Sequence, residues 1–160
     1  MRIYWINDLE TGSIGMMPRP RGNDWLSDEI KHLKQIGVNQ VVSLLESHEM
    51  AELELEMERA NCEEQGIVFS NFPIVDCAVP ESKAAFNAFA EKLIEAIQNG
   101  SKIVVHCRMG IGRTSTLVAT ILIKLGLHKA DVFEYLSEIR TLQVPDTQQQ
   151  KDWVINNFID

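Results

Sequence analysis

The segment that begins at residue 102 places the strongest limit on the fold. It reads KIVVHCRMGIGRTSTLVATILI, in which β-branched residues lead into a glycine-containing loop and then into a long apolar stretch. The first part predicts a strand over residues 102–106, and the last part predicts a helix over residues 114–125. A strand that turns through a short loop into a helix is the repeating unit of an α/β domain.

The rest of the chain continues this alternation. Short runs rich in valine and isoleucine predict further strands, and apolar residues at helical spacing predict further helices. The strands are expected over residues 3–6, 40–45 and 68–72, and the helices over residues 24–36, 82–99, 129–140 and 148–158. Residues 7–23 and 73–81 show neither pattern and are expected to be loops. We therefore predict one α/β domain over residues 1–160, with a central, mostly parallel sheet and helices on both faces in three layers.

Charge and hydropathy exclude some classes of partner. The net charge is -8, whereas a nucleic-acid-binding domain normally carries a basic face. The longest apolar run, residues 117–127, contains Lys124 and is shorter than the roughly 20 residues that cross a bilayer. We expect a monomer that binds neither nucleic acid nor membrane. Glutamates over residues 49–64 alternate with apolar residues, and we expect one helix there with a solvated face.

The cysteines indicate a reducing environment. Cys62, Cys77 and Cys107 match no zinc-binding spacing, and residues 1–11 show no secretory leader. The cytoplasm is the expected location. For Cys62 we favour a buried structural role, which is common for free cysteines.

Cys107 stands at the carboxyl end of the strand over residues 102–106, where open α/β sheets bind ligands. The N-terminus of the next helix directs backbone N–H groups and the positive end of the helix dipole to the same point. Gly110 and Gly112 permit the close backbone approach that a phosphate needs, and Arg113 can donate two hydrogen bonds to its oxygens. A thiol in this setting is expected to be a thiolate at neutral pH. The loop is therefore predicted to hold a phosphoryl group over a nucleophile.

A purely structural explanation would make Cys107 a small buried hydrophobe and the glycines ordinary turn residues. It would leave unexplained why a histidine, a cysteine, a glycine, an arginine and a threonine occur at these offsets between a strand and a helix. We therefore favour the functional interpretation.

The residues His106, Cys107, Gly110, Arg113 and Thr114 match the pattern HCxxGxxR[ST]. This pattern resembles the signature of the cysteine-dependent protein tyrosine phosphatase superfamily. The length and the order of strands and helices resemble its compact, dual-specificity-like branch, over residues 3–158. The resemblance implies hydrolysis of phosphotyrosine in proteins, with phosphoserine and phosphothreonine as further substrates of a dual-specificity enzyme, and it implies no metal or cofactor.

The resemblance also implies roles for individual residues. Cys107 would attack phosphorus to form a phosphocysteine, Arg113 would bind the phosphate oxygens, and Thr114 would hydrogen-bond the departing sulfur. His106 would orient the loop and tune the thiol. The phosphate-binding loop would consist of Arg108, Met109, Gly110, Ile111 and Gly112.

Two further segments resemble parts of the family's active site. In FPIVDCAVPES, Asp76 takes the place of the general acid that protonates the leaving group, although an isolated loop aspartate is commonly a turn residue. The segment VPDTQQQKDWV resembles the one that carries a water-positioning glutamine, which selects Gln150 over Gln148 and Gln149. Asp146 in the same segment is a second candidate acid.

Alternatives remain for the substrate and the activity. A phosphoinositide or a nucleotide is the alternative substrate, although the apolar Met109 and Ile111 weigh against it. A phosphate-binding module without turnover and a sulfur-transfer protein are alternatives of other classes. Arg19 and Arg21 either line the rim of the site or belong to a solvated loop tethered by Trp25.

A redox role is a separate hypothesis. Cys77 or Cys62 would form a reversible disulfide with Cys107, provided that the Cα atoms lie within about 7 Å.

Overall fold

The computed structural model describes residues 1–159 and contains a central sheet. Its strands are β1 (Tyr4–Trp5), β2 (Ser13–Met17), β3 (Gln40–Ser43), β4 (Val68–Asn71) and β5 (Lys102–His106). They lie in the order β1-β2-β5-β3-β4, in which β1 is antiparallel to β2 and the other neighbours are parallel. The carboxyl ends of the parallel strands therefore share one edge of the sheet, where Cys107 follows β5.

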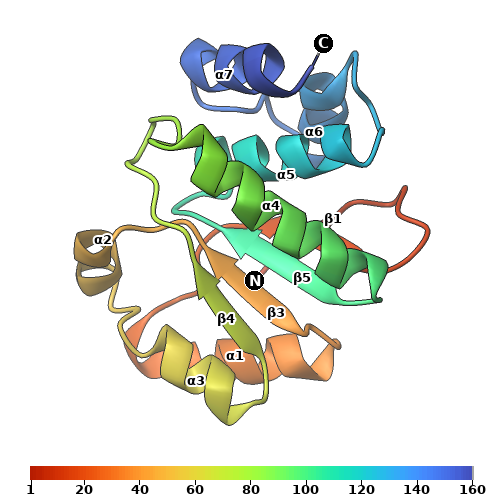
Figure 1. The fold of residues 1–160 in the computed structure, drawn as a ribbon. Helices are drawn as coiled ribbons and strands as arrows, with labels where there is room; N and C mark the ends of the chain where they lie inside the picture. Colours follow the sequence, from red (N-terminus) through yellow and green to blue (C-terminus); the bar gives the residue numbers. More distant parts are fainter. Residues whose placement is uncertain (160) are drawn as a thin grey trace.

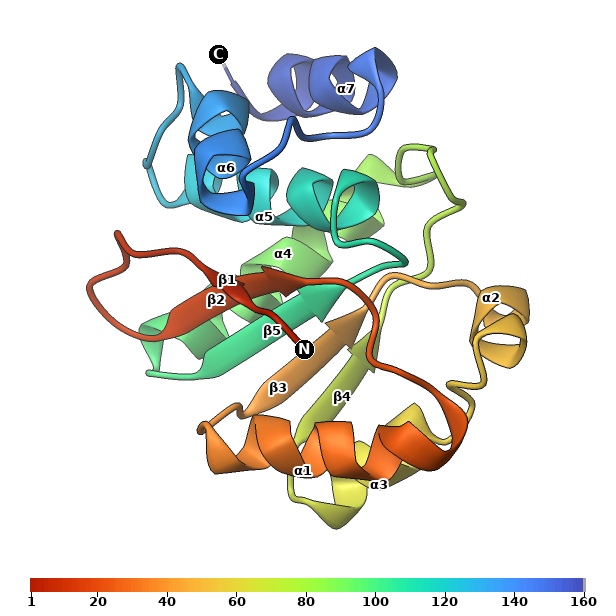
Figure 2. The same ribbon diagram turned by 180° about the vertical axis from the view of Figure 1, so that it is seen from behind.

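Helices cover both faces of the sheet (Figures 1 and 2). One face carries α1 (Leu26–Gln35) and α3 (Glu58–Glu64), and the other carries α4 (Lys83–Gln98) and α5 (Gly112–Lys124). Packed against α5 are α6 (Val132–Arg140) and α7 (Gln148–Phe158), and α2 (Ser47–Glu52) lies beside the carboxyl ends of the strands. The arrangement confirms the predicted fold class, with a mostly parallel sheet in three layers.

Side chains of β5 supply the cores on both faces. Ile103 and Val105 belong to the larger apolar cluster under α4 and α5, whereas Val104 belongs to the cluster under α1 and α3. All three side chains are buried. Successive strand residues point to opposite faces, so an unbroken β-branched run suits a strand that is covered on both sides.

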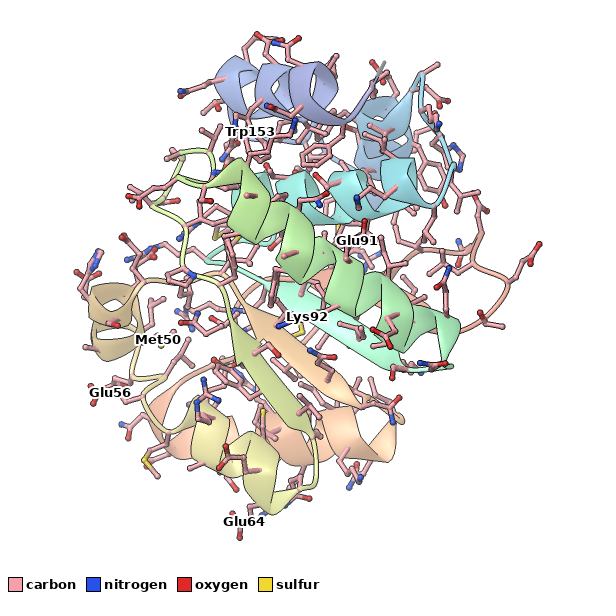
Figure 3. The ribbon with its side chains drawn as sticks, in the orientation of Figure 1. Met50, Glu56, Glu64, Glu91, Lys92 and Trp153 are labelled. Atoms are coloured by element: carbon pink, nitrogen blue, oxygen red, sulfur yellow. The ribbon has the colours of Figure 1, made fainter. Side chains whose placement is uncertain are left out.

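The predicted cap and apolar stripe of α4 are both present. The Ser82 hydroxyl accepts a hydrogen bond from the Ala85 backbone N–H at 3.1 Å, which satisfies one donor of the first helical turn. Phe86 is buried, with its ring centroid 5.3 Å from that of Trp153 on α7. Lys92 lies on the exposed side of the helix (Figure 3).

The prediction of a loop over residues 7–23 is wrong in its middle, because β2 lies there between β1 and β5. The sequence SIGMM has a single β-branched residue, so β-propensity gives little sign of this strand. A Cβ on Gly15 would lie 2.6 Å from Cγ2 of Ile3 and 2.8 Å from Cε3 of Trp5. The glycine therefore makes room for the side chains of Ile3 and of Trp5 in the edge strand β1, which is shorter than predicted.

The acidic run over residues 49–64 forms two helices, α2 and α3, and the prediction of a single helix is wrong. Between them, Glu54 has a φ of +57, a left-handed conformation that a continuous helix cannot contain. Glu49 and Glu58 are each 1% exposed. The run is therefore not simply a solvated face.

The other bounds differ by a few residues: β3 ends at Ser43 and β4 at Asn71, before the predicted ends at residues 45 and 72. The helix predicted over residues 24–36 begins with a 3₁₀ turn at Asn23–Trp25, and the one predicted over residues 129–140 begins at Val132. Residues 73–81 carry neither helix nor strand, as predicted. Within the described part of the chain, no helix has the length and apolar character needed to cross a membrane.

Candidate active site

The loop between β5 and α5 borders a pocket of about 390 Å³. Cys107 is buried there, and the Thr114 hydroxyl donates a hydrogen bond to its Sγ at 3.1 Å. The pocket is lined by Asp76, Cys77, Cys107, Arg108, Met109, Arg113, Asp146 and Thr147. The fold thus brings the predicted nucleophile, the predicted arginine and the predicted acid to one place.

Gly110 and Gly112 let the loop backbone approach its neighbours closely. Gly110 has a φ of +71, which L side chains rarely adopt, and a Cβ on it would collide with the Met17 carbonyl. A Cβ on Gly112 would collide with Oδ2 of Asp146. Gly110 therefore requires glycine, whereas a side chain at position 112 would have to displace Asp146. Gly112 is also the first residue of α5, so the pocket lies at a helix N-terminus, where anions are favoured.

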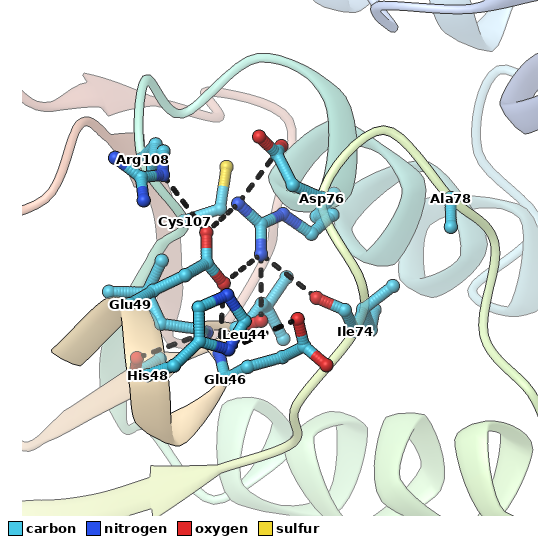
Figure 4. A network of polar contacts seen from close by, with 12 residues as sticks. Leu44, Glu46, His48, Glu49, Ile74, Asp76, Ala78, Cys107 and Arg108 are labelled. Atoms are coloured by element: carbon cyan, nitrogen blue, oxygen red, sulfur yellow. Dashed lines mark hydrogen bonds and ion pairs between the residues drawn. The ribbon is translucent and has the colours of Figure 1, made fainter. Parts of the chain in front are cut away.

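Arg113 lies in the first turn of α5 with 1% of its surface exposed. Its Nη1 donates to the Ile74 carbonyl at 2.8 Å, and its Nη2 donates to Oδ1 of Asp76 at 3.1 Å. The Glu49 carboxylate accepts from both nitrogens, at 2.7 and 2.9 Å. Figure 4 shows Glu49, Ile74 and Asp76 converging beside Cys107. A planar guanidinium held on several sides keeps a fixed orientation in the pocket.

Glu49 on α2 is a site residue that the sequence pattern missed, because the pattern assigns it to a solvated helix face. It also accepts a hydrogen bond from Nε of Arg108 at 3.0 Å, and Glu52 accepts one from Nη2 of Arg108 at 2.7 Å. Burial alone would raise the pKa of Glu49, but the hydrogen bonds from Arg113, the Glu46 backbone and Arg108, with the charge of Arg113, lower it to about 2. Glu49 is therefore a carboxylate at neutral pH.

Two carboxyl groups line the pocket. Asp76, in the loop over residues 73–81, has a half-exposed side chain bonded to Arg113. Asp146 precedes α7. Burial and the neighbouring Asp76 raise the pKa of Asp146, and they outweigh the opposing effects of Arg113 and the Gly112 backbone. Both acids that the sequence offers therefore line the same pocket as Cys107.

His106, the last residue of β5, is fully buried behind the loop. Its Nε2 lies 2.7 Å from Oε1 of Glu58 on α3, and its Nδ1 lies 3.1 Å from the Cys107 carbonyl oxygen. Burial alone would lower the pKa of His106, but the charge of Glu58 and its hydrogen bond raise it. Glu58 is the second residue that the sequence pattern missed.

Of the three adjacent glutamines, Gln150 alone is buried, whereas Gln148 and Gln149 are exposed. Its Nε2 donates to the Ala78 carbonyl at 3.2 Å, and its Oε1 accepts from the Thr147 backbone N–H at 3.2 Å. Gln150 thus connects the start of α7 to the loop that carries Asp76.

Arg19 and Arg21 are not among the residues that line the pocket. Arg21 forms an ion pair with Glu29 at 2.6 Å and lies over the Trp25 ring, 4.4 Å from its centroid. Nη1 of Arg19 donates to the Pro20 carbonyl. These contacts favour the alternative in which Arg19 and Arg21 belong to a loop tethered by Trp25 and do not line the rim of the site.

The two other cysteines differ in their access to Cys107. Cys62 is buried in the cluster under α1 and α3, across the sheet from the cluster that contains Cys107. Burial, with the charge of Glu58, raises the pKa of Cys62 to about 12. Cys77 is exposed and lines the same pocket as Cys107. The geometry therefore favours Cys77 for the hypothetical disulfide, which mass spectrometry after peroxide treatment would test.

Comparison with known proteins identifies relatives. Residues 14–127 match a family model described as "Polymorphic toxin system, DSP-PTPase phosphatase". Protein tyrosine phosphatase type IVA 3 of Bos taurus is 30% identical over 124 residues, which cover 74% of this chain and 64% of that protein. The Homo sapiens protein of the same name is 31% identical over 121 residues, with the same coverage. The chain thus spans about 64% of the length of these curated relatives.

Solved structures share the fold. Kinase associated phosphatase, crystallised with its catalytic cysteine replaced by serine, has a TM-score of 0.88 at 18% identity, over 96% of this chain and 92% of that chain. PTPMT1 in complex with PI(5)P has a TM-score of 0.74 at 19% identity, over 97% of this chain and 94% of that chain. Together with the family match and the HCxxGxxR[ST] loop after β5, these comparisons confirm the resemblance: the chain belongs to the dual-specificity-like branch of the cysteine-dependent protein tyrosine phosphatase superfamily.

Proposed function

We propose that this chain is a phosphatase that hydrolyses phosphomonoesters through a phosphocysteine on Cys107. The observation that carries the proposal is the position of the Cys107 thiol and the Arg113 guanidinium in one pocket at the N-terminus of α5. A helix N-terminus and a guanidinium both attract a phosphate dianion, and a thiolate is a strong nucleophile.

In the first step, Cys107 Sγ attacks phosphorus, and the bond from phosphorus to the leaving oxygen breaks. Arg113 and the loop N–H groups hold the other phosphate oxygens, which is the electrostatic stabilisation that phosphoryl transfer chiefly requires. Asp76 donates a proton to the leaving oxygen. Its hydrogen bond to Arg113 at 3.1 Å supports this role, because it holds the carboxyl group beside the phosphate site.

In the second step, water attacks the phosphorus of the phosphocysteine, and the sulfur leaves with the electron pair of the broken bond. The Thr114 hydroxyl stabilises the departing thiolate, a role supported by its hydrogen bond to Sγ. Asp76, once deprotonated, accepts a proton from the water, with Asp146 as the second carboxylate within the pocket. We assign the positioning of this water to Gln150, which is buried near Gly112.

We propose a phosphoprotein, phosphotyrosine above all, as the substrate. Arg108 forms ion pairs with Glu49 and Glu52, which offset its charge toward a second phosphate. Asp146 adds a carboxyl group to the same pocket, and Met109 on its rim is 62% exposed. An apolar rim with few free cations favours a single phosphate on an aromatic ring over a polyanionic phosphoinositide or nucleotide.

The assignment of residues 1–160 as one catalytic domain, the monomeric state and the cytoplasmic location remain predictions of the sequence. Among residues 1–159, no cluster of potential metal ligands accompanies the pocket. The proposed reaction uses only side chains and water.

The test of the activity is hydrolysis of p-nitrophenyl phosphate, in the presence of EDTA, by the wild type and by Cys107→Ser. We expect turnover by the wild type and none above background by the variant. A wild-type protein that binds phosphate without turnover would instead be a phosphate-binding module. Relative kcat/KM for a phosphotyrosine peptide, a phosphothreonine peptide, a phosphoinositide and a nucleotide then ranks the substrate classes, and a higher value for either of the last two would overturn the proposed substrate.

A further inference from the structure

Asp146 lies on a wall that two pockets share. The pocket lined by Cys107 has a volume of about 390 Å³, and a second pocket of about 340 Å³ adjoins it. Asp146 and Thr147 line both of them. A phosphopeptide whose phosphate lies over Cys107 extends beyond the first pocket. The second pocket is therefore a place where a residue that flanks the phosphotyrosine can lie, with Asp146 beside it.

Contacts with the phosphate-binding loop hold the Asp146 carboxyl group at this position. It accepts a hydrogen bond from the backbone N–H of Gly112, the first residue of α5. Its Oδ2 is the atom that a Cβ on Gly112 would strike, and the same Cβ would lie 3.0 Å from Nε2 of Gln150. Because Gly112 belongs to the loop that follows Cys107, the carboxylate charge stays at the edge of the phosphate site.

The surrounding cations are engaged with other carboxylates. Both arginines that line the first pocket form ion pairs with glutamate or aspartate side chains other than Asp146. Lys151, the cation of the second pocket, has its Nζ 3.6 Å from Oε1 of Glu134. Over residues 1–159, Asp146 forms no ion pair with a basic side chain. Its negative charge is therefore available to a substrate.

The pKa of Asp146 agrees with this lack of compensation. Burial and the charge of Asp76 raise it, and the charge of Arg113 and the hydrogen bond from Gly112 oppose the rise without cancelling it. A raised pKa in a carboxyl group means that its charged form is less favourable than in water. A positive group brought by the substrate would stabilise this charge, and a further negative group would be repelled by it.

We propose that Asp146 is a specificity-determining residue that selects phosphopeptides with an arginine or a lysine next to the phosphotyrosine and disfavours those with an acidic neighbour. The inference rests on the proposed function of the chain as a protein phosphatase. Ile111 and Leu142 line the second pocket with Asp146, and their apolar side chains suit the methylene groups of an arginine or a lysine. The net charge of -8 acts in the same direction, because an acidic protein attracts a cationic peptide from a distance.

The test is kcat/KM for phosphotyrosine peptides that differ in one residue. Arginine or glutamate is placed directly before or directly after the phosphotyrosine in otherwise identical sequences. The peptides are compared at neutral pH with the wild type, Asp146→Asn and Asp152→Asn. Asp152→Asn is the matched control, because Asp152 is an exposed aspartate on α7 that lines neither pocket. The ratio of the arginine peptide to the glutamate peptide within one protein cancels any common effect of a variant on turnover.

We expect the wild type to favour arginine over glutamate by about tenfold at one of the two positions or both, chiefly through KM, because attraction replaces repulsion. The ratio should fall toward one in Asp146→Asn and keep its wild-type value in Asp152→Asn. It should also fall at high salt, which screens charges at a surface. A wild-type ratio at or below one at both positions, or an unchanged ratio in folded Asp146→Asn, would overturn the proposal.

A binding measurement separates this inference from the proposed activity. Cys107→Ser lacks the thiol nucleophile, so the Kd of each peptide can be measured by calorimetry without turnover. The arginine peptide should bind about tenfold more tightly than the glutamate peptide, and the double variant with Cys107→Ser and Asp146→Asn should lose this difference. Equal Kd values for the two peptides in Cys107→Ser would overturn this inference. Absence of p-nitrophenyl phosphate hydrolysis by the wild type would instead overturn the proposed function.

Discussion

The Arg113 guanidinium and the Glu49 carboxylate form a two-pronged ion pair, with Nη1 to Oε2 at 2.7 Å and Nη2 to Oε1 at 2.9 Å. Both side chains are 1% exposed. The pair connects α2, which follows β3, to the first turn of α5, which follows β5. It fixes the plane of the guanidinium that the mechanism uses to hold phosphate.

Replacement of Glu49 by glutamine should therefore lower activity more than it disturbs the fold. The amide can accept one hydrogen bond from Arg113, but it cannot hold both nitrogens. We expect kcat/KM for p-nitrophenyl phosphate to fall by about 10- to 100-fold, because small errors in the position of a catalytic group carry large rate costs. Glu52→Gln is the control, since Glu52 is exposed and contacts Arg108 alone among the arginines. Equal losses in the two variants would contradict this role for Glu49.

The same pair makes stability depend on pH. The pKa of Glu49 falls from its ordinary value of 4.5 to about 2 in the folded protein. A carboxyl group with a lowered folded pKa contributes stability that is present above the unfolded pKa and is lost as pH falls through the folded pKa. Urea unfolding should therefore show a decline in the free energy of unfolding between about pH 4.5 and pH 2 that is weaker in Glu49→Gln. Parallel declines in both proteins would exclude Glu49 as a contributor.

Asp76→Asn tests the general acid. The amide cannot protonate a leaving oxygen, so kcat for a phosphotyrosine peptide should fall by about 10²- to 10⁴-fold, the usual contribution of a positioned acid. The nitrophenolate of p-nitrophenyl phosphate leaves without a proton, so the loss with that substrate should be much smaller. Equal losses with both substrates would show that Asp76 does not act as the acid.

Asp146→Asn tests the second carboxyl group. Because burial and Asp76 raise the pKa of Asp146, its charged form is less favourable in the folded protein. A carboxyl group with a raised folded pKa lowers the free energy of unfolding as pH rises through that folded pKa. Asp146→Asn should therefore melt at a higher temperature than the wild type at pH 7 and at the same temperature near pH 3. Asp152→Asn, on the exposed side of α7, is the control.

The nucleophile loop could be predicted in detail because local chemistry determines it. The β-branched run, the two glycines and the arginine carry the information for the strand, the turn and the helix start within residues 102–114. The cap at Ser82 and the choice of Gln150 likewise follow from offsets within one segment. Such features depend on neighbours in the chain, which the sequence displays directly.

Glu49 and Glu58 could not be found in this way, because their partners lie 64 and 48 residues away. In sequence they are two glutamates among several, and composition alone places them on the surface. The alternating stretch ELELEM does not reveal which glutamates turn inward. β2 was missed for a related reason, since its strand character comes from pairing with β5 and not from its own residues.

Capture of the phosphocysteine tests the proposed mechanism at its first step. Wild-type protein is mixed with a phosphotyrosine peptide, stopped with acid within the first turnovers, and digested for mass spectrometry. The proposed mechanism requires one added phosphoryl group on the peptide that contains Cys107, with none in Cys107→Ser. Steady turnover by the wild type with no phosphoryl group on Cys107 at any quench time, or with the group on another residue, would contradict it.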